Sequence, residues 1–236
     1  MIRAMALSAL RFALAASVSA AALTGAPPTS VLAAARPTLV VRETGASTKH
    51  LGHKNTETSW GAVLVNPSRT HDAIRIGVTV TLVGATGKPI PGQGVVVDGT
   101  LPLIPAGQVF YLGGNSNLRG YVNVRGVRVD LRIGATIPKR YGLPIVSNVH
   151  VGSNGQISAT ITNPYATSIR PYDYTADAVF FDQRGRVIGG IDLGQIGNFI
   201  HEPSIRPRGK APLSFVTLGV VSAARITSAR ISVFPG

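Results

Sequence analysis

The chain repeats its own pattern of strands and turns, and this repetition constrains the fold more than any other feature of the sequence. Residues 60–67 and residues 156–164 both end in Asn-Pro, and each is followed by a run of alternating apolar and polar residues. Ile-Pro-Ala-Gly at 104–107 and Ile-Arg-Pro-Arg-Gly at 205–209 each lead into the last strand-like run of their half. Self-similarity of this kind indicates a duplicated structural unit.

The alternation itself predicts β-strands. Between residues 74 and 82, apolar residues occupy the even positions, and Arg, Gly or Thr the odd ones. Between residues 127 and 133 the odd positions are apolar and the even ones charged. A period of two is typical of a strand with one buried face. Clusters of Gly, Pro and Asn between such runs predict turns at residues 66–68, 86–89, 97–99, 113–115, 152–155 and 182–185.

These signals predict an all-β protein with two tandem immunoglobulin-like β-sandwich domains, each of about seven short strands. The first domain is expected at residues 36–134 and the second at residues 145–236, with a proline-containing linker at 135–144. Trp60, the single tryptophan, is expected at a strand start, because the Cys-Trp-Cys pattern of true immunoglobulin domains is missing. The alternative is one continuous sandwich shared by both halves.

Residues 1–35 are interpreted as a cleaved signal peptide. Arg3 and Arg11 give a basic start, a run of small apolar residues follows, and an alanine-rich stretch at 31–35 offers cleavage sites. The alternative, a transmembrane anchor, needs about 20 apolar residues, and the run is shorter. We therefore expect a protein that is secreted or associated with a bacterial cell envelope, with no transmembrane anchor. The absence of cysteine excludes a lipoprotein anchor, thiol catalysis and disulfide bonds.

The formal net charge of +13 favours anionic partners. We expect an anionic envelope polymer or another envelope protein as the partner, and no specific nucleic acid, because aromatic residues are few. The alternative is that the charge only keeps the protein soluble. The alternating pattern points some arginines outward, and the predicted anion-contacting residues are Arg125, Arg128, Arg132, Arg225 and Arg230.

One segment of the second half carries a family resemblance. The motif consists of Asn-Pro, an alternating strand and then Phe-Phe-Asp-x-x-Gly-x-Val-Ile-Gly, and it covers residues 160–190. It resembles the FxLYD-type and late-embryogenesis-abundant-like domains through Asn163, Phe180, Phe181, Asp182, Gly185, Arg186 and Val187. The first half departs from the motif at residues 83–87. The resemblance implies a small β-sandwich in a secreted or envelope-associated protein, and it supplies no catalytic residues.

The motif residues also have a local structural interpretation. The Asp182 carboxylate can accept backbone N–H groups two residues on, and Gly185 can adopt the left-handed conformation that closes a hairpin. Asn163 can cap the turn that Pro164 begins.

Exposed strand edges must also be covered, and residues 95–97 and 213–221 are apolar enough to dock on another sheet. Either the two halves cover each other or a partner chain does.

The sequence predicts no metal site and no cofactor. His50 and His53, with Glu57 or His71 as a further ligand, are interpreted as parts of an exposed polar loop. The segment Gly-Gly-Asn-Ser-Asn at 113–117 is interpreted as a hairpin loop. A phosphate-binding loop is the alternative, but no helix follows whose N-terminus could bind phosphate.

No catalytic residues are predicted. There is no Gly-x-Ser-x-Gly nucleophile motif, and Asp173 and Asp177 are too far apart along a strand for glycoside cleavage, so they are expected to pair with arginines. The leading hypothesis is a non-enzymatic exported binding or spacer module. The alternative is a secreted hydrolase whose site lies in loops and uses Asp182, Asp192, His201 and Glu202.

Overall fold

The structure, a computed structural model, describes residues 38–236 except 53, 201 and 218. The signal-peptide prediction lies outside the described residues. Antiparallel strands dominate, together with three short 3-10 helices, and this confirms the prediction of an all-β sandwich fold. The strands are β1 (Val40–Leu51), β2 (Asn55–Val65), β3 (His71–Val83), β4 (Val95–Ile104), β5 (Val109–Arg119), β6 (Gly126–Pro138), β7 (Ile145–Val151), β8 (Gln156–Thr162), β9 (Tyr174–Phe181), β10 (Val187–Gln195), β11 (Lys210–Val216) and β12 (Ser228–Pro235).

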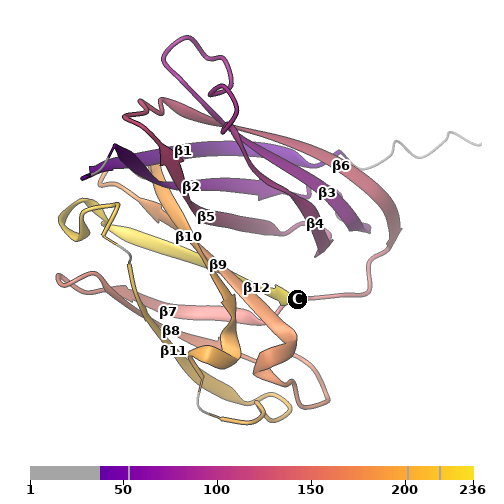
Figure 1. Ribbon diagram of the computed structural model, residues 1–236. Helices are drawn as coiled ribbons and strands as arrows, with labels where there is room; N and C mark the ends of the chain where they lie inside the picture. Colours follow the sequence, from indigo (N-terminus) through magenta and orange to yellow (C-terminus); the bar gives the residue numbers. More distant parts are fainter. Residues whose placement is uncertain (1–37, 53, 201, 218) are drawn as a thin grey trace, which may run out of the picture. The chain divides into compact units, whose positions relative to one another are not determined.

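Each half of the described chain supplies two three-stranded sheets. The first half forms the sheets β1-β2-β5 and β4-β3-β6, and the second half forms β10-β9-β12 and β11-β8-β7. Each half therefore has six strands rather than the predicted seven or so. Within the compact unit Arg36–Gly236, the sheets β1-β2-β5 and β10-β9-β12 contact each other, and the other two sheets lie outside them (Figure 1).

Each half has its own hydrophobic core. In the first half, fully buried residues such as Trp60 and Phe110 fill the space between the two sheets. In the second half, Ile157 and Leu213 do the same. The last strand links the two, because Phe234 of β12 packs in the first core with its ring 5.0 Å from that of Phe110. A third, smaller cluster joins the inner sheets through Val63, Val179 and Val187.

Glycines bring the backbones of the two inner sheets unusually close together. A Cβ atom on Gly61 would lie 2.5 Å from the carbonyl oxygen of Gly189, and one on Gly190 would lie 2.6 Å from the carbonyl oxygen of Trp60. A Cβ on Gly113 would meet the carbonyl oxygen of Ala178 at less than 3.0 Å, a separation that forces a neighbour to move. Any larger side chain at these positions would hold the sheets apart.

This closeness lets side chains of one sheet hydrogen-bond the free strand edge of the other. The Ser59 hydroxyl accepts the N–H of Gly190 at 2.9 Å and donates to its carbonyl oxygen at 2.6 Å. On the opposite edge, the Ser232 hydroxyl accepts the N–H of Tyr111 at 2.7 Å. The Glu43 carboxylate accepts the N–H of Val187 at 2.8 Å. The two halves thus cover the outer edges of β10 and β5, one of the two arrangements that the sequence left open.

The predicted turn residues at both Asn-Pro segments make the expected bonds. Asn163 Oδ1 accepts the N–H of Tyr165 at 2.9 Å, and its buried amide donates to the carbonyl oxygens of Ile205 and Arg206 at 3.0 Å. Asn66 does the same in the first half, with its amide donating to the Ile104 carbonyl oxygen at 3.0 Å. Each asparagine therefore ties its own turn to the later Ile-Pro or Ile-Arg segment of its half.

Several sequence predictions are wrong. Residues 97–99 and 113–115 lie inside β4 and β5 instead of in turns. The glycines at 113 and 114 therefore form no loop. Gly113 is needed for the close approach of the sheets, whereas Gly114 leaves room for the Trp60 ring of the neighbouring strand. Trp60 lies in the middle of β2, not at its start. In the two segments expected to dock on another sheet, Leu213 and Phe215 are buried in the core of their own half, and Val95 is 60% exposed.

We predict that Gly113→Ala destabilises the protein by about 1–3 kcal/mol, the usual cost of overpacking a tight contact. The added methyl group would overlap the β9 backbone and also disturb the neighbouring edge hydrogen bonds. Gly77→Ala is the matched control, because Gly77 also lies within a strand but its Cβ would have only ordinary contacts at 3.7 Å. Urea unfolding of both variants measures the difference; equal stabilities would contradict the role given to Gly113.

Candidate functional site

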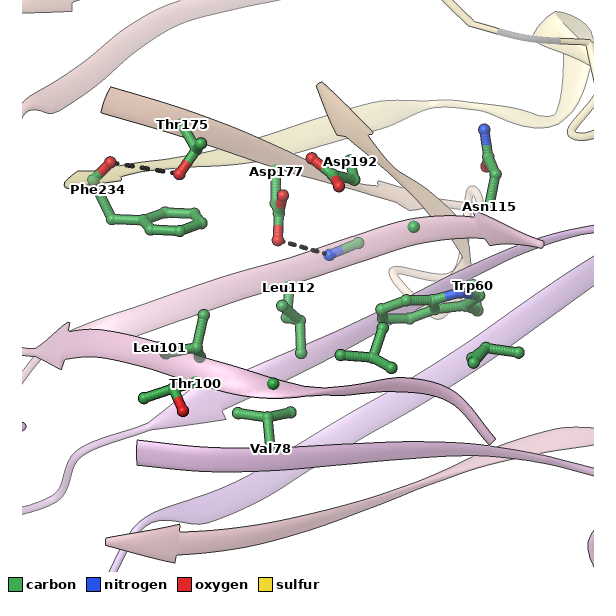
Figure 2. A pocket seen from close by; sticks show the side chains of 15 residues that line it. Trp60, Val78, Thr100, Leu101, Leu112, Asn115, Thr175, Asp177, Asp192 and Phe234 are labelled. Atoms are coloured by element: carbon green, nitrogen blue, oxygen red, sulfur yellow. Dashed lines mark hydrogen bonds between the residues drawn. The ribbon is translucent and has the colours of Figure 1, made fainter. Parts of the chain in front are cut away.

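A cavity of about 360 Å³ opens where strands of the two halves meet. Trp60 of β2 and Leu112 of β5 line it from the first half, and Asp177 of β9 and Phe234 of β12 from the second (Figure 2). Residues of β4, including Leu101, complete the lining. The cavity is mostly apolar, and its acidic groups come from two neighbouring strands.

The acidic groups are the carboxyls of Asp177 and Asp192. They are direct partners in the β9–β10 register, so their side chains lie on the same face of the sheet. Asp177 is 4% exposed, and its Oδ2 accepts the N–H of Gly113 at 3.3 Å. Burial, and then the negative charge of Asp192, raise the pKa of the Asp177 carboxyl well above its usual value. The raised pKa favours the neutral, protonated form of Asp177 in this site.

The surroundings of Asp177 and Asp192 indicate a structural role at the junction of the two halves. Asp192 Oδ1 accepts the N–H of Gly194 at 2.7 Å, where the register of β10 shifts, while Asp177 accepts an N–H at the edge of β5 across the junction. The cavity lining contains no histidine, lysine, arginine or serine. The Trp60 Nε1–H is buried and has no partner within the described residues. The site thus provides a buried carboxyl group, that of Asp177, whose hydrogen bond to Gly113 joins the two halves.

The expectation that Asp177 pairs with an arginine is wrong: its carboxyl interacts with Gly113 and Asp192 and forms no ion pair with any arginine that the structure describes. Asp173 does not share its strand either, because it lies in the 3-10 helix Pro171–Asp173 that precedes β9. The sequence signal that could have found the Asp177 contact is an aspartate at an apolar-facing strand position, opposite a glycine-rich strand.

All five arginines predicted to contact anions are exposed, but they do not form one patch. Arg128 and Arg132 lie on β6, with Asp130 between them, and Arg128 Nε is 3.2 Å from Asp130 Oδ2. Arg125 lies just before the same strand. Arg225 lies in the 3-10 helix Ala223–Arg225, and Arg230 lies on β12.

Arg225 is part of a basic hollow that the sequence did not reveal. Arg184 and Arg186, from the turn between β9 and β10, line this hollow of about 390 Å³ together with Arg225 and Asp182. The Asp182 carboxylate forms an ion pair with Arg186, with Nη2 2.8 Å from Oδ2. Hydrogen bonds from the backbone and side chain of Arg186 lower the pKa of the Asp182 carboxyl. Three arginines and one aspartate thus line the hollow, so that its formal charge is net positive.

Asp182 also confirms the predicted turn. Its Oδ1 accepts the N–H of Arg184 at 2.9 Å and that of Arg186 at 3.0 Å, and Gly185 has a φ of 73°. The residues proposed for a hydrolase site do not converge: Asp182 lines the basic hollow, Asp192 lines the junction cavity, and Glu202 lines a third pocket. His201 lies outside the described residues.

The histidines that were weighed and rejected as metal ligands lie in the following places. His50 lies near the end of β1, in a hairpin with β2, rather than in the expected polar loop, and its Nδ1 is 3.0 Å from Thr56 Oγ1. His71 Nδ1 is 3.0 Å from Thr70 Oγ1. His53 is outside the described residues. Among the residues that are described, no group of three or more His, Cys, Asp or Glu side chains could hold a metal ion.

No family model and no curated protein match this sequence. Among solved structures, the crystal structure of red sea bream transglutaminase is similar over 75% of this chain and 27% of its own, with 16% sequence identity and a TM-score of 0.21. A likeness at this TM-score supports no assignment of fold or activity. The resemblance to FxLYD-type domains stays a prediction. In the described part of the chain, no helix has the length and apolarity needed to cross a membrane.

We predict that Asp177→Asn stabilises the protein increasingly as the pH rises from about 4 to 7. Because the pKa of Asp177 is raised in the folded state, its protonation stabilises the folded protein. This contribution to the free energy of unfolding is full below the pKa of an unfolded aspartate, about 3.9, and is lost as the pH rises through the pKa of Asp177 in the folded state. Asparagine keeps an acceptor for the Gly113 N–H but does not titrate. Unfolding midpoints at several pH values measure the effect.

Asp98→Asn is the matched control for this experiment, because Asp98 is an exposed strand aspartate of β4. A stability difference between Asp177→Asn and the wild type that stays constant from pH 4 to 7 would show that the buried carboxyl does not titrate abnormally.

Proposed function

We propose that this chain is a non-enzymatic exported binding or spacer module, which is held at a bacterial cell surface by contacts with an anionic envelope polymer. Another envelope protein with an acidic surface is the second partner class that fits this proposal. The observation that carries it is the basic hollow lined by Arg184, Arg186 and Arg225.

The hollow suits a flexible polyanion. Guanidinium groups bind phosphate and carboxylate oxygens through paired hydrogen bonds, and Arg184 and Arg225 have no ion-pair partner in the described part of the protein. Arg125, Arg132 and Arg230 are exposed elsewhere on the surface and would add weaker contacts. Each exposed contact is worth less than about 1 kcal/mol, so that retention requires many of them together.

The spacer part of the proposal draws on the duplicated pattern. Asn66 and Asn163 make equivalent bonds in the two halves, which supports a tandem repeat of one β-sandwich unit. Two docked sandwiches without cysteine give a rigid element that keeps its structure without disulfide bonds. The FxLYD-type resemblance of residues 160–190 fits the same envelope context.

The test is a salt wash of cell envelopes, followed by detection of the protein in each fraction. We predict that wild-type protein is retained at low salt and released progressively as the salt rises, because the Debye length falls from about 10 Å at 0.1 M to about 3 Å at 1 M. The double variant Arg184→Gln, Arg225→Gln should elute at lower salt. Soluble polyphosphate and polyglutamate provide the corresponding binding assay in solution.

A control of equal charge separates the hollow from net charge. Arg69→Gln with Lys88→Gln removes two exposed positive charges away from the hollow. If both double variants elute alike, the hollow has no special role and only diffuse charge binds. Complete release of the wild type at physiological salt would show that the surface charge only keeps the protein soluble. Retention of the wild type at 1 M salt would point to specific or covalent anchoring.

A further inference from the structure

A second concave site lies at the junction of the two halves and contains three of the chain's six tyrosines. We call it the tyrosine groove; its volume is about 520 Å³. Tyr141 comes from the segment between β6 and β7, Tyr165 from the loop after β8, and Tyr174 from the start of β9. Arg170, which precedes the 3-10 helix Pro171–Asp173, and Asp173, the last residue of that helix, line it as well. This volume is typical of pockets that bind small ligands.

The walls of the tyrosine groove are fixed by hydrogen bonds. The Tyr165 hydroxyl donates to the carbonyl oxygen of Gly142 at 2.7 Å. The buried Asp72 carboxylate accepts the N–H groups of Arg140 at 2.8 Å and Tyr141 at 3.0 Å, so the backbone that carries the exposed Tyr141 ring is held in place. A groove whose walls are already ordered loses little conformational entropy when a ligand binds.

The polar groups on the rim need a ligand that both donates and accepts hydrogen bonds. Arg170 and Asp173 are exposed, and neither forms an ion pair or a side-chain hydrogen bond with any residue that the structure describes. One is a donor only, and the other, when ionised, is an acceptor only. Hydroxyl groups can satisfy both, and the exposed Tyr141 ring offers an apolar face for the C–H groups of a sugar ring.

Other ligand classes fit this groove less well. The charges of Arg170 and Asp173 cancel, so the groove lacks the net positive charge that distinguishes the basic hollow. An anionic polymer would meet repulsion from the Asp173 carboxylate. A polyproline segment could stack on the tyrosines, but it has no N–H groups to donate to that carboxylate.

We propose that the tyrosine groove binds a neutral saccharide, with a sugar ring stacked on Tyr141 and neighbouring hydroxyl groups bonded by Arg170 and Asp173. This goes beyond the proposed anion binding, because it uses another surface and another chemistry. The two activities differ in a measurable way: saccharide binding should change little with salt, whereas polyanion binding should be lost.

The experiment is an NMR titration of the full mature protein, labelled with nitrogen-15, with a trisaccharide of N-acetylglucosamine and with cellotriose. We expect at least one of them to shift the amide signals of residues around Tyr141 and Asp173, with an affinity that is nearly the same in 0.05 M and 0.5 M salt. Tyr141→Ala should weaken binding about tenfold, the effect of losing roughly 1.4 kcal/mol of contact energy, and Tyr141→Phe should preserve it. Asp173→Asn and Arg170→Gln should each weaken it as well.

Tyr121→Ala is the matched control, because Tyr121 is 67% exposed and lies between β5 and β6, outside the tyrosine groove. It should bind like the wild type. The proposal is overturned if neither saccharide shifts these signals, if Tyr121→Ala weakens binding as much as Tyr141→Ala, or if a hexaproline peptide binds there and the saccharides do not. Since none of these outcomes involves the envelope-retention assay, this proposal and the proposed function fail independently.

Discussion

The close approach of backbone to backbone between β2 and β5 on one side and β9 and β10 on the other is the constraint on which the rest of the structure depends. A serine hydroxyl is short, and it reaches the edge of a facing sheet only if no side chain separates the two. Gly61, Gly113 and Gly190 provide that contact. Ser59 and Ser232 then accept edge N–H groups that would otherwise be buried without a partner. Each such unpartnered N–H group would destabilise the folded state by about 1–3 kcal/mol.

The same docking shapes both concave sites at the junction. The cavity beside Asp177 and the tyrosine groove each take residues from both halves, so neither would exist in a half that stood alone. Asp72 extends this coupling, because its carboxylate binds the N–H of Ala106 in the first half and those of Arg140 and Tyr141 in the connecting segment. The path of that segment, and hence one wall of the groove, is set by a buried residue of β3.

Sequence reasoning reached the local structure and missed the junction. Period-two patterns and the Asn163 and Asp182 turns depend on nearby residues, and the structure confirms both. Gly113 and Gly114 were misinterpreted because paired glycines usually mark a turn, whereas here another backbone passes Gly113 and the Trp60 ring packs on Gly114. Glycine inside a strand pattern is itself a signal of such an approach, and it recurs at Gly61 and at residues 189–190. Which strands meet depends on contacts distant in sequence, which no local pattern encodes.

The positive surface follows from how the few acidic side chains are used. Asp72, Asp177 and Glu43 point inward and accept backbone N–H groups at the junction or in the linking segment. Asp192 accepts the N–H of Gly194 within its own strand, β10. Only two ion pairs form among the residues that the structure describes, and both join neighbours on the same strand or turn. These four carboxylates are thus committed to the backbone and do not neutralise exposed arginines. The tight junction and the uncompensated surface charge are therefore two consequences of one distribution of acidic groups.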